Sequence, residues 1–284
     1  AGERVSRAEP LPVPVHDDHT HLNFEPDADL WDGDEPRGID RAIAELDAAE
    51  AVGVAGVVQV GTNLADSRWA VALAERDPRV LAAIAIHPND APALAAEGGL
   101  DAALAELDVL AARPRVRAIG ETGLDFFRTA DEGRPDQRAS FEAHIAITKR
   151  HGLALQIHDR DAHDAVLGVL AEVGAPERTV LHCFSGDADF ARRALDAGCH
   201  LSFAGTVTFK NAGYLREALA VAPLDRVLVE TDAPFLTPHP FRGRPNAPSY
   251  LPVTLRAMAD VLGLDVAELG TAVRENAIRV YGQW

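Results

Sequence analysis

The strongest constraint on the fold is an alternation of short apolar segments with longer segments of helical periodicity, repeated along the chain. Eight apolar segments carry the pattern of buried β-strands. They cover residues 13–17, 53–61, 80–88, 116–124, 153–159, 179–186, 199–205 and 226–234. Amphipathic helical patterns lie between them, and residues 252–284 are helical in pattern as well.

This alternation predicts a parallel sheet covered by helices. Eight strand and helix units within 284 residues favour an α/β fold in which the sheet closes into a (β/α)8 barrel of the TIM type. We therefore expect residues 1–14 to form an N-terminal tail and residues 15–284 to form a single barrel domain. The C-terminal helices are expected to pack on the outside of the barrel.

Composition limits the classes of function. The chain has 27 Lys and Arg against 44 Asp and Glu, a formal net charge of -17, which disfavours a protein that coats duplex DNA with a broad basic surface. The charge is still compatible with a deep site that binds the end of one nucleic-acid strand through metal ions. Two cysteines are too few for a disulfide framework, no apolar segment reaches membrane length, and the first residues lack a signal-peptide core. We expect a cytoplasmic protein.

Imidazoles and carboxylates recur at the carboxyl ends of the predicted strands. In the segment HDDHTHL, at residues 16–22, alternate residues of a strand face the same side, so Asp17, His19 and His21 would share one face. The ends of the fourth, fifth, sixth and eighth strands carry Glu121, His158, His182 and Asp232. A single His or Asp at a strand end is more often a structural residue. His19 and His21 together with these four residues make six at the edge where barrel enzymes carry their chemistry, and six indicate a site.

The mixture of imidazoles and carboxylates at these strand ends suits divalent cations. Imidazole with a shared carboxylate suits Zn, Mn or Fe, whereas a shell richer in carboxylate and water suits Mg. We expect two ions, because six ligands exceed what a single open catalytic centre takes from the protein. Glu121 has two carboxylate oxygens and is the natural bridge between the ions.

The motifs around these positions follow one another in a characteristic order. They are DDHTHL, IGETGLD, the IH of the fifth strand, HCFSG, TFKNAG, and ETDAPFLTP followed by RGRPN. This series resembles the TatD family of metal-dependent deoxyribonucleases in the amidohydrolase superfamily, from about Val15 to Gly282. The resemblance implies a (β/α)8 barrel, two divalent ions (Mg, Mn or Zn) and hydrolysis of DNA phosphodiesters, typically from a 3' end.

The resemblance also implies roles for the ligands. The first ion would be held by His19, His21 and Asp232, the glutamate would bridge, and the second ion would be held by His158 and His182. The substrate would be single-stranded DNA or a 3' end, and the protein is expected to be a monomer without a membrane partner.

The expected chemistry makes Asp232 and Glu121 the catalytic carboxylates. Two ions would lower the pKa of a bridging water from about 16 toward roughly 7 and clamp the phosphate oxygens. The resulting hydroxide would attack phosphorus in line, with Asp232 either accepting the proton or acting only as a ligand. The same ligands also allow two alternatives: a metal-dependent ester or amide hydrolase, such as an aminoacyl-tRNA deacylase, and a non-catalytic metal-binding scaffold.

Candidate substrate contacts lie after the predicted strands. Ser185 precedes a helix, where backbone N–H groups can bind a phosphate, and Lys210 follows the seventh strand. His87 ends the third strand and is expected to contact substrate or a ligand rather than the metal. Arg242 and Asn246 lie in the Pro-rich segment after the eighth strand and are expected to contact a nucleic-acid backbone at the mouth.

Other polar residues are expected to support the ligands. Asp17, beneath the first histidines, and Asp125 in GLDFFR are expected to orient ligand side chains. His16 and Asp18 are expected to point away from the site. Glu230 would lie lower in the barrel interior, and the sequence indicates no partner for it.

Overall fold

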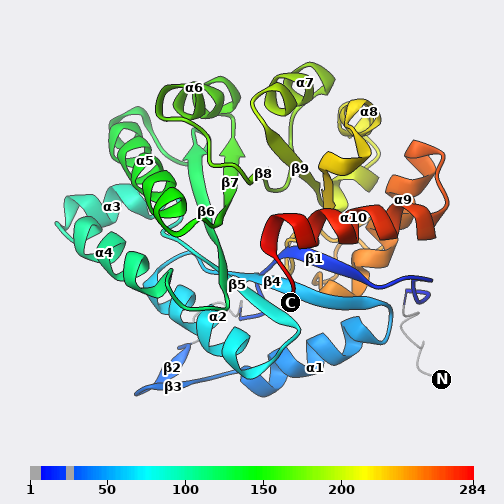
Figure 1. Ribbon diagram of the computed structural model, residues 1–284, viewed down its shortest axis with the longest axis horizontal. Coiled ribbons are helices and arrows are strands. Elements are labelled where there is room, and N and C mark those ends of the chain that lie inside the picture. The colour runs from blue at the N-terminus through cyan, green and yellow to red at the C-terminus, as the bar shows by residue number, and fades with distance from the viewer. Residues whose placement is uncertain (1–7, 24–28) are drawn as a thin grey trace.

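The strands of the main sheet pair in parallel, in their order along the chain (Figure 1). The computed structural model describes residues 8–23 and 29–284. The eight strands are β1 (Val15–Thr20), β4 (Val54–Val60), β5 (Val80–Ile84), β6 (Val116–Asp125), β7 (Ala154–Arg160), β8 (Thr179–Leu181), β9 (Cys199–Phe203) and β10 (Val227–Val229). Backbone hydrogen bonds of 2.9 Å from Asp232 to His19 and from His21 to Ala233 join the ends of the first and last strands. The predicted barrel is confirmed.

Helices surround the sheet, as Figure 1 shows. They are α1 (Ile39–Glu50), α2 (Leu64–Arg76), α3 (Ala91–Ala96), α4 (Leu100–Leu110), α5 (Arg134–His151), α6 (His163–Val173), α7 (Ala188–Asp196), α8 (Gly213–Val221), α9 (Leu251–Leu262) and α10 (Val266–Tyr281). Side chains of Asn63, Asp187 and Asp265 cap the first turns of α2, α7 and α10. A short hairpin of β2 (Trp31–Asp32) and β3 (Glu35–Pro36) was not predicted. Within the described residues, no helix is long and apolar enough to cross a membrane.

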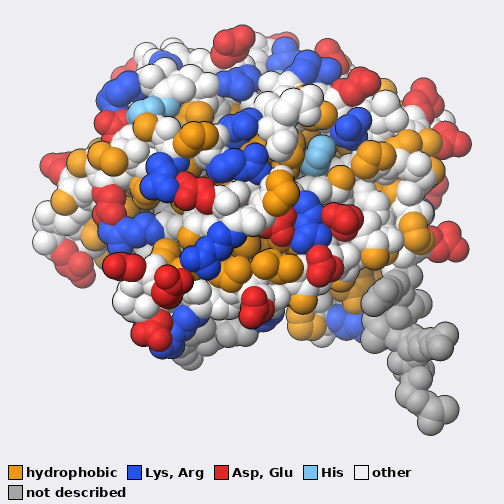
Figure 2. Space-filling model, turned by 60° about the horizontal axis from the view of Figure 1, so that its bottom comes forward, with side chains coloured by type: hydrophobic (Ala, Val, Ile, Leu, Met, Phe, Trp, Pro, Cys, Tyr) orange, Lys and Arg blue, Asp and Glu red, His pale blue; other side chains and the backbone are white. Residues whose placement is uncertain are grey.

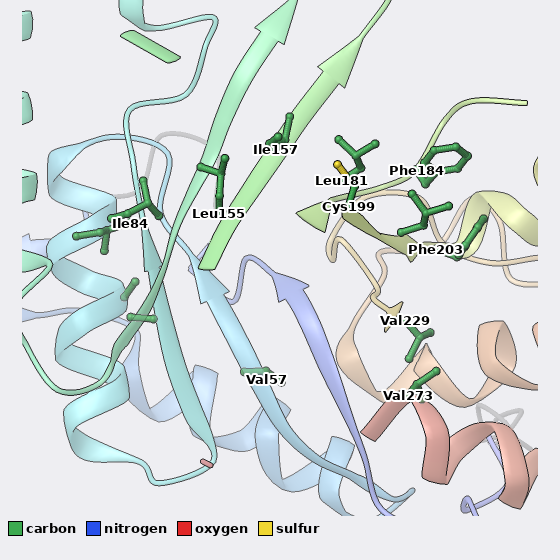
Figure 3. Packing of buried hydrophobic residues seen from close by; sticks show 14 of the residues in the cluster. Val57, Ile84, Leu155, Ile157, Leu181, Phe184, Cys199, Phe203, Val229 and Val273 are labelled. Carbon is green, nitrogen blue, oxygen red and sulfur yellow. The ribbon is translucent and has the colours of Figure 1, made fainter. Parts of the chain in front are cut away.

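The apolar core lies between the sheet and the helices (Figure 3). Val57, Ile84 and Leu155 from the strands and Val273 from α10 belong to it and are at most 2% exposed. Burial of such side chains is the main term that stabilises the barrel. On the face shown in Figure 2, Lys and Arg side chains lie among acidic and apolar ones, so this face carries no broad basic surface.

The last helix departs from the prediction that both C-terminal helices pack on the outside. α9 does pack against α8, but α10 runs across the N-terminal end of the barrel (Figure 1). Its Ala277, Val280 and Tyr281 join a separate apolar cluster with side chains of the strands, and Arg117 and Arg178, at or just before the starts of β6 and β8, donate to the Tyr281 and Val280 carbonyls. Trp284 follows, stacks on His16 with 3.9 Å between ring centroids, and donates to a strand carbonyl. The C-terminal helix therefore closes one end of the barrel.

The described part of the expected N-terminal tail, residues 8–14, lies against the barrel. Leu11 is buried, and its N–H donates to the Val52 carbonyl at 2.9 Å. The Arg256 guanidinium from α9 donates to the carbonyls of Glu9 and Pro10. Residues 1–7 lie outside the described residues.

Candidate metal centre

The carboxyl ends of the strands bring together all the side chains that the sequence predicts as ligands: His19, His21, Glu121, His158, His182 and Asp232. His19 Nε2 lies 3.2 Å from His21 Nε2, and 3.4 Å from both Glu121 Oε2 and Asp232 Oδ1. His21 Nε2 lies 3.3 Å from the same Asp232 oxygen and 3.6 Å from the same Glu121 oxygen. Four donors placed about 2.1 Å from one tetrahedral ion stand about 3.4 Å apart. This first set of donors therefore fits one divalent ion.

A second set of donors faces the other oxygen of Glu121. His158 Nδ1 lies 2.9 Å, His182 Nε2 3.2 Å and His87 Nε2 3.3 Å from Glu121 Oε1. Glu121 thus presents one oxygen to each set, which is the geometry a bridging carboxylate needs. The sequence anticipated that His87 contacts substrate or a ligand rather than the metal. Its Nδ1 accepts from the backbone N–H of Asn89 at 3.1 Å, so its Nε2 carries the hydrogen that faces Glu121.

The remaining ring nitrogen of each of the four histidines predicted as ligands has a hydrogen-bond acceptor on the protein. His21 Nδ1 donates to the Val60 carbonyl at 2.9 Å, and His158 Nε2 pairs with Asp125 Oδ2 at 2.9 Å. His182 Nδ1 lies 3.1 Å from Glu230, the carboxylate for which the sequence indicated no partner. Such acceptors fix the tautomer and orientation of an imidazole and leave its other nitrogen free for a metal.

The charges of the site depend on its own contacts. Burial would raise the pKa of Glu121, but the charges of His182 and His87 and hydrogen bonds from His158 and His182 lower it well below its usual value. Burial and the charge of His182 lower the pKa of His19 to about 4, so this imidazole is neutral at pH 7. Burial acts in the same direction on His21, but the hydrogen bond and charge of Asp232 outweigh it and raise its pKa to about 9.

We expect metal uptake to release protons and to strengthen as the pH rises. His21 and His158 both have pKa values raised to about 9, His158 because its hydrogen bonds to Asp125 and Glu121 outweigh burial. A metal must displace these protons, so affinity should rise roughly tenfold per pH unit for each proton released, up to about pH 9. Calorimetric titration with Mn or Zn in buffers of different ionisation enthalpy measures the released protons. Binding without proton release at neutral pH would contradict this expectation.

Several residues of the first strand and its neighbours lie differently from the expectation. The Asp17 carboxylate accepts from Thr231 and from the backbone N–H of His19, and so touches the backbone rather than the ring. Asp18, expected to point away, lies in the barrel interior against Ser202 and Tyr281. The pairing of β1 with β4 shifts between Asp17 and Thr20, so strict alternation of side chains does not hold there.

Three of the predicted substrate contacts, Ser185, Arg242 and Lys210, differ in their position relative to the cavities next to the ligands. Ser185 is exposed and lines a cavity beside the site, but α7 is capped by Asp187, so Ser185 precedes the helix without capping it. Arg242 stacks on Phe209, 3.9 Å from its centroid. Lys210 is exposed and stands apart from the described residues that line the two cavities next to the ligands.

Asn246 does not have the expected role at the mouth. Its side chain is 5% exposed, and its Nδ2 donates to the carbonyls of Thr231 and Phe235 at 2.9 and 2.7 Å. Its Oδ1 accepts from the backbone N–H of Ala247. All of its polar groups are used within the protein, so Asn246 holds the segment after β10 in place instead of contacting a substrate.

Two adjoining cavities of about 340 and 320 Å³ open onto the ligands. They share Glu121, His158, Arg160, Asp232 and Phe235. Arg160 and Phe235, and Arg128 in the larger cavity, were not among the residues predicted from the sequence. The position of Arg160 directly after a ligand motif, in IHDR, is a signal that identifies it. Both cavities are large enough to hold a small ligand.

Comparison with known proteins identifies the family of the chain. Residues 16–282 match the family described as TatD related DNase. A Mycobacterium tuberculosis protein named as an uncharacterized metal-dependent hydrolase TatD is 45% identical over 273 residues, covering 94% of this chain and 97% of that protein. A Citrobacter rodentium protein named 3'-5' ssDNA/RNA exonuclease TatD is 36% identical over 240 residues, covering 82% of this chain and 89% of that protein.

Solved structures share the fold. The crystal structure of YJJV, a TatD homolog from Escherichia coli, superposes with a TM-score of 0.81 at 27% identity, over 94% of this chain and 97% of that one. A hydrolase of the TatD family from Entamoeba histolytica has a TM-score of 0.79 at 19% identity, over 96% of this chain and 100% of that one. The chain belongs to the TatD family of metal-dependent hydrolases.

Proposed function

We propose that this hydrolase is a deoxyribonuclease that removes nucleotides from a 3' end of single-stranded DNA and uses two divalent ions. The observation that carries the proposal is the division of the donors into two sets that share Glu121, one oxygen facing each set. Two ions held a few ångströms apart by a shared carboxylate are the arrangement used for in-line displacement at phosphorus. The printed name of the Citrobacter relative supports the same class of substrate.

The proposed ligands of the first ion are His19, His21 and Asp232, and those of the second are His158 and His182, with Glu121 shared by both. The mixture of imidazole and carboxylate suits Zn, Mn and Mg. Bound ions would lower the pKa of a water molecule and neutralise charge on the phosphoryl group.

Asp232 is suited to accept the proton of the attacking water. Its side chain is 14% exposed, against 0% for His19 and 7% for Glu121, and it lines both cavities. Burial would raise its pKa, but the hydrogen bond from His21 and the charges of His182 and His19 lower it. The carboxylate is therefore ionised at neutral pH and stands where the two cavities meet, so we assign it the general base as well as a ligand position.

Charge changes sign around the rim of the larger cavity. Asp66 and Asp90 line it after β4 and β5, whereas Arg128 and Arg160 line it at the ends of β6 and β7. A phosphodiester backbone is attracted to the arginine side and repelled from the acidic side. The acidic side suits a terminal sugar with a free hydroxyl. Phe235, 43% exposed and shared by both cavities, offers a ring on which a base can stack.

The proposal predicts stepwise shortening of single-stranded DNA from a 3' hydroxyl end. A 5'-labelled oligonucleotide should shorten with Mg or Mn and stay intact with a chelator. The same oligonucleotide with a 3' phosphate should react roughly tenfold more slowly, because the phosphate meets Asp90. The variant Asp90→Asn should narrow this difference.

Asp101→Asn is the matched control, because Asp101 is an exposed aspartate of α4 that lies apart from the described residues lining both cavities. Asp101→Asn should leave unchanged the difference in shortening rate between the oligonucleotides with a 3' hydroxyl and with a 3' phosphate. No shortening with any of the metals would contradict the proposal. Hydrolysis of an aminoacyl ester on a tRNA end, without loss of nucleotides, would support an ester hydrolase in its place.

A further inference from the structure

A chain of buried hydrogen bonds connects the last turn of α10 to the ring of His19. The Tyr281 hydroxyl donates to Asp18 Oδ2 at 2.8 Å, and Ser202 donates to the other oxygen of Asp18 at 2.6 Å. Gln156 Nε2 donates to the Tyr281 oxygen at 2.8 Å and to the Asp18 carbonyl at 2.6 Å. Gln156 Oε1 lies 2.8 Å from His19 Nδ1. All five side chains are at most 1% exposed.

Each member of this chain restricts the role of the next. Because the phenol donates its hydrogen to Asp18, its oxygen is left as an acceptor and must face a donor, the NH₂ group of Gln156. The amide oxygen of Gln156 then faces His19, which must donate its Nδ1 hydrogen to it. The lone pair of His19 is thereby placed on Nε2, the atom that faces His21, Glu121 and Asp232.

We infer that Tyr281 is a positioning residue for the metal centre: its hydroxyl orients Gln156, and Gln156 fixes the tautomer and direction of His19. The inference rests on the proposed role of His19 as a ligand, but not on the nature of the substrate. Its consequence is that the C-terminal helix takes part in metal binding from the opposite end of the barrel.

The position of Tyr281 makes this role possible. The residue ends α10, and its ring packs with Ala277 and Val280 in the apolar cluster at the N-terminal end of the barrel. The phenol ring fills apolar space, so its hydroxyl is the part that reaches the polar interior. A phenylalanine at this position would satisfy the packing, but the Gln156 NH₂ group would keep only the Asp18 carbonyl as an acceptor, and Asp18 Oδ2 would lose its donor.

The test compares metal binding by Tyr281→Phe and by the wild-type protein. After removal of metal by a chelator, titration calorimetry with Mn or Zn should show the first-ion affinity lowered about 10- to 100-fold, with a smaller change for the second ion. Gln156→Met should give a similar loss. The double variant should lose about as much as either single variant, because both residues act through one chain.

Trp284→Phe is the matched control, since Trp284 stacks on His16 and meets the Tyr281 ring edge-on, with 6.2 Å between centroids, but its indole N–H donates to the Val57 carbonyl, outside the hydrogen-bonded chain. Its metal affinity should equal that of the wild type, and circular dichroism should show every variant folded. Wild-type affinity in folded Tyr281→Phe or Gln156→Met, additive losses in the double variant, or an equal loss in Trp284→Phe would overturn the inference. If the wild-type protein binds no metal, the ligand assignment fails and the inference fails with it.

Discussion

Replacing Asp232 by Asn is expected to lower the rate constant for hydrolysis about 10³-fold while most of the bound metal is retained. An amide cannot accept the proton of the attacking water. The ion of the first set would still have His19, His21 and Glu121, whose donor atoms lie 3.2 to 3.6 Å from one another. Single-turnover hydrolysis of labelled single-stranded DNA measures the rate, and elemental analysis of the purified variant measures the metal.

Asp260→Asn provides the control, because Asp260 is an exposed aspartate in α9. It should behave as the wild type in both measurements. A rate near that of the wild type in Asp232→Asn would remove Asp232 from the chemistry, whereas loss of metal together with rate would leave it a ligand only.

The sequence was sufficient to predict the barrel and the convergence of the candidate ligands. The carboxyl ends of parallel strands meet at one end of a closed sheet, so residues as distant as His19 and Asp232 had to approach each other once the fold was assigned. The distances between their donor atoms then follow from the backbone contacts between β1 and the segment after β10. The family resemblance added the assignment of the individual ligands to the first or the second ion.

Other features depend on details that periodicity does not encode. Asp18 lies in the barrel interior, against expectation, at a point where the pairing of β1 with β4 shifts, and a shift of this kind is a local irregularity that periodicity does not reveal. α10 has the same amphipathic pattern whether it covers a side or an end of the barrel, so its closure of the N-terminal end was not predicted. Asn246 is polar and lies in a loop, yet its carbonyl partners become apparent only in the folded structure.

The residues that line the cavity were also not predictable from periodicity alone. Arg160 is exposed, and its guanidinium lies 4.0 Å from the centroid of the Phe127 ring. It lines the cavity because it ends β7, and its being an arginine does not by itself predict that position. In the sequence, Asp66 and Asp90 are acidic residues at the starts of helices, where such residues are common, and nothing marks them as part of a site. Their charge matters because the closed sheet sets them across a shared cavity from Arg128 and Arg160. The polarity of the site is thus a property of the barrel, and single motifs do not contain it.

Replacing Glu121 by Gln is expected to remove both ions, in contrast to Asp232→Asn. Each oxygen of Glu121 faces one set of donors, and the nearest nitrogens, of His158 and His182, lie 2.9 and 3.2 Å from Oε1. An amide has one oxygen and one NH₂ group, so at least one set would face a donor in place of an anionic ligand. Hydrolysis should fall at least about 10³-fold, and elemental analysis should find less than one ion per chain.

The two carboxylate variants therefore separate binding from proton transfer. Glu121→Gln should lose bound metal and hydrolytic activity together. A high metal concentration should restore part of the hydrolysis rate only if the variant still binds the ions weakly. Glu97→Gln, at an exposed glutamate after α3, should retain both. If Glu121→Gln kept two ions at wild-type affinity, the bridge would be wrong, and the two sets of donors would have to bind their ions independently, as two separate sites within one barrel mouth.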